Sequence, residues 1–127
     1  MRVYRHKTFA RFQRKQRLGD ETLCQAVARA EAGLIDADLG SGLIKQRVPR
    51  MGQGRSGGFR VLVAFKAGRR AVLLFGFAKN DRDNLEADEL VELKSFAAGL
   101  LEADDNTIED LVDREDLKEV NCEQPDE

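Results

Sequence analysis

Two apolar segments that follow one another along the chain, residues 58–67 and 70–78, constrain the fold most strongly. The sequence AGRR lies between them and is typical of a tight hairpin. In the first segment Val61 and Phe65 fall on one face, which leaves Arg60 on the other. The second segment, RRAVLLFGF, is apolar on both faces, as expected of a central strand that is buried on both sides. These residues predict the centre of a β-sheet.

Further elements are predicted on either side of this hairpin. Before the hairpin, the sequence predicts a short strand around Val3, a helix over 7–18, a second helix and a strand over 43–50. The second helix has Asp20 as its N-cap and Gly33 as its C-terminal stop. After the hairpin, a helix is predicted over 85–101. This order indicates an α+β fold, in which two N-terminal helices and a C-terminal helix pack on a small antiparallel sheet. We expect the helices on one side of the sheet and the other side open for function.

The last part of the chain is short of apolar residues. Ile108, Leu111 and Val112 are spaced as in one short amphipathic helix, and a frayed acidic end is expected after it. A chain of 127 residues has room for one domain with a core and a tail. We therefore divide it into a domain over residues 1–103 and an acidic C-terminal segment over residues 104–127.

The charges are distributed unevenly, although their sum is only -2. Residues 1–82 contain 18 Lys and Arg against 6 Asp and Glu, whereas residues 83–127 contain 3 against 17, so the two parts carry +12 and -14. This asymmetry is typical of a body that binds a polyanion and carries an acidic appendage. The alternative is an ordinary solvated surface on which opposite charges pair with each other.

Some classes of protein fit the sequence poorly. The ends do not resemble a signal peptide, and no apolar run approaches the roughly 20 residues that span a bilayer. Cys24 and Cys122 lie 98 positions apart, without a CxxC motif or a cluster of Cys and His, which argues against a zinc site and a disulfide framework. We expect a cytoplasmic protein with two reduced thiols and no contact with a membrane.

Four basic residues form the candidate catalytic cluster. Lys45 and Arg47 are two apart on one predicted strand and so share a face, which Arg60 joins if the strands are neighbours. Lys79, just after the hairpin, completes the cluster. Like charges this close repel one another, and an anionic ligand relieves the repulsion. A solvated basic face without a ligand is the open alternative.

Other candidate residues have simpler explanations. His6 is the only histidine, which rules out a paired-histidine nuclease mechanism, and a surface role at the end of a strand is favoured over a catalytic one. Phe59 and Phe77 can stack on a base, but a role in the core is favoured for each. Asp81 and Asp83 are too few for a two-metal centre and are better suited to capping the following helix.

The sequence resembles the RelE/ParE superfamily of type II toxins, in particular its HigB-like branch, over the runs LGSGLIKQRVPRMGQGRSGGFRVLVAFKAG and LLFGFAKNDRDNL. The residues that carry the resemblance are Lys45 and Arg47, the segment Gly57-Gly58-Phe59-Arg60 that opens a strand, and Phe77-Ala78-Lys79-Asn80. The similarity extends from the first helix through the acidic C-terminal segment.

This resemblance implies a RelE-like fold and a toxin that cuts mRNA on the ribosome and is silenced by a cognate antitoxin. In that family the ribose 2'-hydroxyl attacks the adjacent phosphate, which leaves a cyclic phosphate and a 5'-hydroxyl. Arg60 is then the candidate contact to the non-bridging phosphate oxygens. Lys45 is the candidate base, because neighbouring positive charges favour its neutral amine, and Lys79 or Arg47 is the candidate group at the leaving oxygen. The scheme needs no metal and no cofactor.

Six further residues are expected to contact RNA. They lie on a basic stripe of the first helix, beside or within the glycine-rich turn, and on the last strand of the hairpin: Arg11, Arg14, Lys15, Arg50, Arg55 and Phe77. The expected partners are therefore the ribosome, its mRNA and the antitoxin.

Two other functions stay open. A ParE-like inhibitor of DNA gyrase shares the fold without cutting RNA, and a non-catalytic RNA-binding module would use the same basic face. The cluster of four basic residues favours the nuclease. The acidic segment has two possible positions: docked on the basic face, where it would shield the RNA site, or packed on the far side, where it only offsets charge. The far side is slightly favoured.

Overall fold

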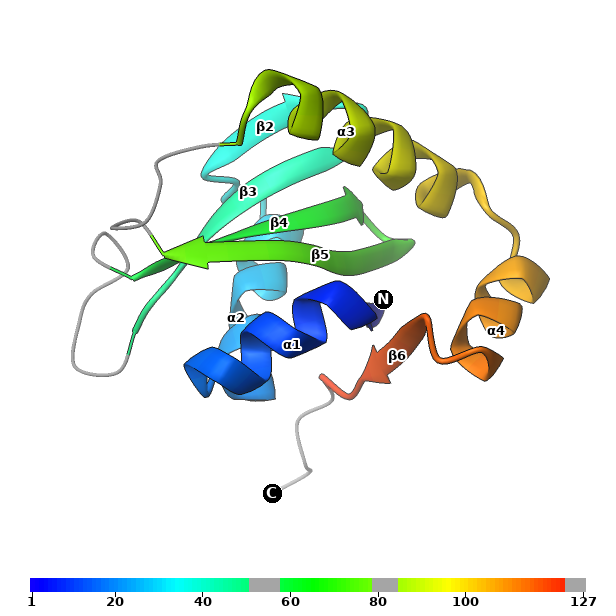
Figure 1. The fold of residues 1–127 in the computed structure, drawn as a ribbon, viewed down its shortest axis with the longest axis horizontal. Coiled ribbons are helices and arrows are strands. Elements are labelled where there is room, and N and C mark those ends of the chain that lie inside the picture. Colours follow the sequence, from blue (N-terminus) through cyan, green and yellow to red (C-terminus); the bar gives the residue numbers. More distant parts are fainter. Residues whose placement is uncertain (51–57, 79–84, 123–127) are drawn as a thin grey trace.

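The computed structural model describes residues 1–50, 58–78 and 85–122. Its elements in chain order are β1 (Arg2–His6), α1 (Lys7–Gln16), α2 (Asp20–Glu31), β2 (Ala37–Gly40), β3 (Leu43–Val48), β4 (Phe59–Lys66), β5 (Arg70–Ala78), α3 (Ala87–Glu102), α4 (Asp105–Asp113) and β6 (Leu117–Val120). The strands form one six-stranded sheet in the order β2-β3-β4-β5-β1-β6. Figure 1 shows α3 on one side of the sheet and α1 with α2 on the other.

The β4–β5 hairpin lies within the sheet, as the sequence predicts. Every residue from Phe59 to Phe65 is buried, and β5 pairs with β4 on one side and with β1 on the other. The turn contains Gly68, whose φ of 73° lies in the left-handed region that favours glycine. Burial on both faces explains why the two strands are nearly continuous runs of apolar residues.

Helices cover both faces of the sheet, which corrects the expectation that one face is open. On one face α1 and α2 contribute Phe9, Leu23 and Val27 to a core with β3, β4 and β5. On the other face α3 and α4 contribute Leu100 and Ile108 to a second core. The apolar side chains on both faces of β5 require this arrangement, because an uncovered face would leave them in water.

The sheet is antiparallel except where β1 runs parallel to β5. After β1 the chain passes through α1 and α2 before it enters β2 at the far edge of the sheet. A long connection of this kind permits two strands to lie side by side in the same direction. The α+β fold class is confirmed, with a mixed sheet in place of a purely antiparallel one.

The two N-terminal helices lie close to their predicted positions. The second helix ends before Gly33, whose φ is 86°, as expected of a C-terminal stop. Its N-cap is Gly19 rather than Asp20, because Asp20 is already helical and its carboxylate accepts a 2.7 Å hydrogen bond from Arg5. The side chain of Asp20 therefore pairs with Arg5 of β1 and does not cap the helix.

The helix predicted over 85–101 is observed as α3. Glu86 and Glu89 form a capping box at its start. Asp81 and Asp83, which are predicted to cap this helix, lie outside the described residues. Among the helices of the described ranges, none combines the length and the apolar character needed to cross a membrane.

Two short edge strands, β2 and β6, have no counterpart in the sequence pattern. β6 pairs antiparallel with β1, and its residues Leu117 and Val120 enter the two cores. The expectation of a frayed acidic end is therefore wrong for residues 117–120. The short helix around Ile108 is confirmed as α4, and the division of the chain at residue 103 stays a prediction.

The two cysteines form a disulfide, which corrects the prediction of reduced thiols. The bond joins Cys24 in α2 to Cys122, which follows β6, with 5.4 Å between the two Cα atoms. A separation of 98 residues gives no indication of this contact. Because β6 pairs with β1, Cys122 lies close to the N-terminal helices and to Cys24.

Candidate active site

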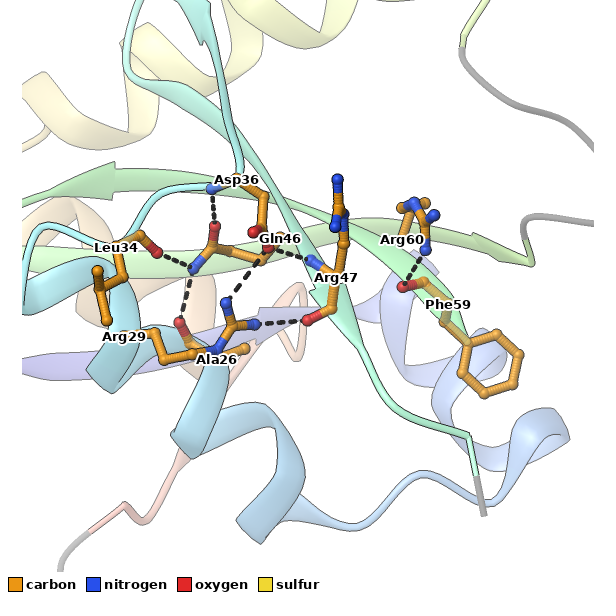
Figure 2. Close-up of polar contacts among 8 residues, drawn as sticks. All are labelled: Ala26, Arg29, Leu34, Asp36, Gln46, Arg47, Phe59 and Arg60. Carbon is orange, nitrogen blue, oxygen red and sulfur yellow. Dashed lines mark hydrogen bonds and ion pairs between the residues drawn. The ribbon is translucent and has the colours of Figure 1, made fainter. Parts of the chain in front are cut away.

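Arg47 and Arg60, two of the predicted catalytic residues, lie directly opposite each other on β3 and β4. Figure 2 shows both side chains on the same side of the sheet, whereas Phe59 points to the other side. Leu62, two residues after Arg60, belongs to the core beneath α3 and α4, so the two arginines lie on that face. The strand register brings them together as the sequence pattern indicated.

Lys45 lies on the same face, two residues before Arg47 on β3 and opposite Leu62 on β4. Lys45 is half-buried, whereas Arg47 is exposed. Diagonal neighbours in an antiparallel pair have Cα atoms roughly 7–8 Å apart, which is within the reach of two long side chains that contact one phosphate. The structure thus groups Lys45, Arg47 and Arg60, while Lys79 lies outside the described residues.

Gly58 permits the close approach of β3 and β4 at this end of the sheet. A Cβ atom on Gly58 would overlap the carbonyl oxygen of Val48 and lie 2.8 Å from the amide nitrogen of Arg50. Both of these are backbone atoms, which do not move aside as the end of a flexible side chain does. Gly58, two residues before Arg60, therefore has a structural role: it allows β4 to begin beside the end of β3.

Arg60 is the least exposed of the three described basic residues, with 9% of its surface accessible. Its neighbour on β5 is Phe77, which is 5% exposed, and Arg60 Nη1 donates to the carbonyl oxygen of Phe59 at 3.5 Å. Burial reduces the screening of the guanidinium charge by water and strengthens its attraction for an anion. The burial of Phe77 supports a role in the core, which the sequence analysis favours over base stacking.

The Arg29–Asp36 ion pair holds the backbone of Arg47 from the outer side of β3 (Figure 2). Asp36 Oδ2 accepts a 2.7 Å hydrogen bond from the N–H of Arg47, and Arg29 Nη2 donates to the carbonyl oxygen of the same residue at 2.5 Å. Arg29 Nη1 and Asp36 Oδ2 are 3.3 Å apart. Because β2 pairs with β3 only as far as Lys45, these two side chains take the place of a neighbouring strand at Arg47.

Gln46 anchors the same region from the core side. It is fully buried, its amide nitrogen donates to the carbonyl oxygens of Ala26 and Leu34, and its amide oxygen accepts from the N–H of Asp36 at 2.8 Å. Sequence reasoning missed Arg29, Asp36 and Gln46. A glutamine on the core side of a strand is the signal that indicates such a network, because buried amides are almost always hydrogen-bonded.

Asp36 stays ionised at neutral pH. Burial raises the pKa of its carboxyl group, but the hydrogen bonds from Arg47 and Arg29, together with their positive charges, lower it by more. The pKa of Asp36 therefore lies below its ordinary value. The ionised carboxylate of Asp36 therefore accepts the hydrogen bond from the N–H of Arg47 at neutral pH.

The predicted RNA-binding residues of α1 lie on the other face of the sheet. The helix buries Phe9 in the core shared with α2, and its residues Arg11, Arg14 and Lys15 are not part of the Arg47 face. Arg11, Arg14 and Lys15 are exposed. They cannot contact an anion held between Arg47 and Arg60, because the sheet lies between the two groups.

Arg50 also lies toward the α1 side. Its guanidinium carbon is 5.0 Å from the centre of the Phe59 ring, and that ring packs edge-on against Phe12 of α1. A cation over an aromatic face is attracted by the ring electrons, so Arg50 has a structural role at this position. Arg55, the other basic residue predicted near the turn, lies outside the described residues.

His6 caps α1 and takes no part in the cluster. Its Nδ1 accepts a 3.2 Å hydrogen bond from the N–H of Thr8, and its ring packs edge-on against Phe96 at 5.3 Å between centroids. Burial and the nearby charge of Lys7 lower the pKa of His6. This arrangement fits the structural role that the sequence analysis favours.

The described part of the acidic segment pairs with cations away from this site. Asp105 lies 3.2 Å from Arg70, and Glu119 lies 2.9 Å from Arg2, at the beginnings of β5 and β1. The candidate active site lies toward the opposite end of β5. The helix α4 packs on the same face of the sheet as Arg60, but these acidic residues pair with cations at the other end of the strands. Whether the acidic segment shields the RNA site stays a prediction.

The chemistry available at this cluster is that of guanidinium and ammonium groups. Within the described ranges, no group of three or more His, Cys, Asp and Glu side chains is arranged to hold a metal ion. Arginine and lysine side chains donate hydrogen bonds and supply positive charge, and arginine does so in a planar fork that matches phosphate. The cluster therefore suits the binding of a phosphate group.

Comparison with known families decides where the chain belongs. A family model described as the RelE toxin of the RelE/RelB toxin-antitoxin system matches residues 1–120. The chain belongs to the RelE toxin family. A search of curated proteins found no match. The family resemblance read from the sequence is confirmed, whereas the HigB-like branch stays a prediction.

Membership in the RelE family gives the protein the role of a toxin in a toxin-antitoxin system and implies a cognate antitoxin as its partner. The RelE match runs from the first strand of the sheet to the last, β1 to β6. It therefore includes the Lys45, Arg47 and Arg60 face as well as the described part of the acidic segment.

Proposed function

We propose that this RelE-family protein is a ribosome-dependent endoribonuclease that cleaves mRNA and so inhibits translation. The observation that carries the proposal is the register pair of Arg47 and Arg60, with Lys45 on the same face. Two guanidinium groups and one amine on adjacent strands supply enough donors and charge to contact a single phosphate from several directions.

In the proposed reaction the ribose 2'-oxygen attacks the adjacent phosphorus, and the bond from phosphorus to the 5'-oxygen of the next nucleotide breaks. The products are a 2',3'-cyclic phosphate and a 5'-hydroxyl. The proton of the 2'-hydroxyl passes to Lys45. The departing 5'-oxygen takes a proton from Lys79, or it takes one from water while Arg47 stabilises its negative charge. No metal or cofactor takes part in this scheme.

Arg60 stabilises the charge that develops on the non-bridging oxygens. Its guanidinium is held by β4 next to Phe77 and is largely shielded from water, so its attraction for the transition state exceeds that of an exposed arginine. Its position is set before the substrate binds, because Gly58 and the strand register define where β4 begins.

We assign the role of base to Lys45 because of its position. It is half-buried and lies on the same face of the sheet as Arg47 and Arg60. Lysine is among the side chains that serve as general bases when they lie within hydrogen-bond reach of the proton that they accept.

Dependence on the ribosome and a cytoplasmic location are part of the proposal. The described site offers little for binding bases, since Phe77 is buried and Arg50 contacts Phe59. A ribosome that holds the mRNA in place supplies the positioning that the site lacks, and positioning alone contributes a large share of catalysis. Membership in the RelE toxin family supports the same partner.

Mapping the 5' ends of mRNA in cells that express the protein tests this function. Cuts inside translated codons are expected, and they disappear when Arg60 is replaced by Met. Inhibition of growth with altered DNA supercoiling and intact mRNA would instead indicate a gyrase inhibitor. RNA binding without any cut would indicate a non-catalytic module.

A further inference from the structure

A second basic surface lies at the β1–β6 edge of the sheet, whereas Arg47 and Arg60 lie on β3 and β4. It is a pocket of about 690 Å³ between α1, the end of β1, β6 and the residues that connect α4 to β6. Six cationic side chains and one acidic side chain line it: Arg5, Lys7, Arg11, Arg14, Arg17 and Lys118, with Glu115. Arg5 faces α1 and α2, since its guanidinium donates to Gln13 and Asp20, whereas Leu117 belongs to the core on the α3 and α4 face.

Four of these cations have no carboxylate partner in the part of the chain that the structure describes. Arg5 and Lys7 pair with Asp20 and Asp116 at 2.7 and 2.8 Å. The remaining cations, by contrast, form no ion pair with any described acidic residue: Arg11, Arg14, Arg17 and Lys118. Cations that converge on one pocket repel each other, and an anionic partner relieves the repulsion.

Two residues of the pocket wall have a left-handed backbone. Arg17, the C-cap of α1, has φ 56°, and Glu115, just after α4, has φ 64°. Glycine is the usual residue at such a helix end, because a side chain strains the backbone in this conformation. The chain keeps an arginine at this place, which places its charge at the rim of the pocket.

The floor of the pocket distinguishes between two kinds of anionic partner. It contains the aliphatic side chains of Ala10, Leu18, Val112 and Leu117, and no aromatic residue lines it. Proteins that bind single-stranded RNA typically stack its bases on aromatic rings. Aliphatic side chains ringed by cations instead match a peptide that carries apolar residues on one side and Asp or Glu on the other.

We propose that this pocket is the docking site for an acidic, amphipathic segment of the cognate antitoxin. The proposal rests on membership in the RelE family and on the pocket, and it holds whether or not the protein cuts RNA. It assigns Arg11 and Arg14 to a protein partner instead of RNA. It also places an anchor for the antitoxin at the β1–β6 edge of the sheet, away from Arg47 and Arg60 on β3 and β4.

Two neighbouring residues of α1 provide a matched test. Arg14 lines the pocket, whereas Lys15 does not, and both are exposed. Arg14→Glu and Lys15→Glu therefore change the charge of the same helix by the same amount at adjacent positions. Lys118→Glu tests the β6 side of the pocket independently, and thermal unfolding shows whether each variant is folded.

The measurement is the dissociation constant for the labelled cognate antitoxin, by fluorescence anisotropy, with full-length protein. We expect Arg14→Glu and Lys118→Glu each to raise it about tenfold or more, and Lys15→Glu to leave it within about twofold. Equal effects of Arg14→Glu and Lys15→Glu would overturn the proposal, because only net charge would then matter. Wild-type affinity in both pocket variants would overturn it as well.

A short single-stranded RNA serves as the second probe in the same assay. We expect its affinity to change equally in Arg14→Glu and Lys15→Glu, as for a non-specific charge effect. Loss of RNA binding in the two pocket variants, with antitoxin binding retained, would assign the pocket to RNA and contradict the proposal. Failure of the protein to cleave mRNA would leave the antitoxin result unaffected.

Discussion

Arg47 on β3 and Arg60 on β4 form a directly opposed pair of cations on one face of the sheet. Like charges at such positions repel one another. Gly58 and the Arg29–Asp36 pair nevertheless hold the register. Two guanidinium groups side by side on one face attract an anion, which is what a phosphate-binding site requires.

Replacement of Arg60 by Met lowers the rate of mRNA cleavage about a hundredfold, because one transition-state donor contributes on the order of 3 kcal/mol. Met keeps an apolar stem of similar length beside Phe77 and so preserves packing. The rate is measured with purified ribosomes and a translated mRNA. Lys66→Ala removes an exposed cation from the other end of the same strand and serves as the control with wild-type rate. An undiminished rate in folded Arg60→Met would remove Arg60 from the site.

Replacement of Lys45 by Arg does not preserve cleavage if Lys45 is the base, since a guanidinium stays protonated. Lys45→Ala and Lys45→Arg therefore reduce the single-turnover rate to a similar degree. Binding of the RNA is less affected by Lys45→Arg, which keeps the positive charge. Full cleavage activity of Lys45→Arg would show that Lys45 contributes charge and accepts no proton.

Arg29 acts on cleavage through Arg47, whose carbonyl oxygen it holds. Arg29→Ala lowers the rate in the wild-type background, but it has little further effect in an Arg47→Ala background, which gives a coupling of about 0.5–3 kcal/mol. Arg69→Ala is the matched control, because Arg69 also donates to a backbone carbonyl, that of Ala103, away from the site. Equal losses in both backgrounds would mean that Arg29 only stabilises the fold.

Loss of the Cys24–Cys122 disulfide lowers the free energy of unfolding by about 2–4 kcal/mol, since the bond closes a long loop in the unfolded chain. Urea unfolding with and without a reductant measures the effect. Cys24→Ser behaves like the reduced protein and is insensitive to the reductant. Disulfides are rare in the cytoplasm, so at the proposed cytoplasmic location the reduced form is the one to compare with activity in cells. Identical unfolding midpoints with and without the reductant would contradict the expectation.

The central hairpin and the grouping of Lys45, Arg47 and Arg60 were predictable from the sequence. Alternation with a period of two places Lys45 and Arg47 on one face, and the short AGRR turn makes β4 and β5 neighbours. These features depend on residues that are near one another in the sequence or on adjacent strands.

Features that depend on distant residues were not predictable in the same way. The edge strands β2 and β6 are four residues long and pair through backbone groups, so their side chains give little periodicity. The Cys24–Cys122 bond and the contact of Arg29 with Arg47 require the placement of α2 relative to the sheet. Coverage of both sheet faces was implied by the apolar residues on both faces of β5, but the helix pattern alone does not show which face each helix takes.

The chemical nature of the RNA ends tests the central claim most directly. Purified protein is incubated with ribosomes translating a defined mRNA, and the fragments are analysed for their terminal groups. The account predicts 2',3'-cyclic phosphate and 5'-hydroxyl ends inside translated codons, which require the ribosome and are lost in Arg60→Met. Ends that carry a 5'-phosphate, cleavage that persists in Arg60→Met, or the absence of any cleavage would contradict it.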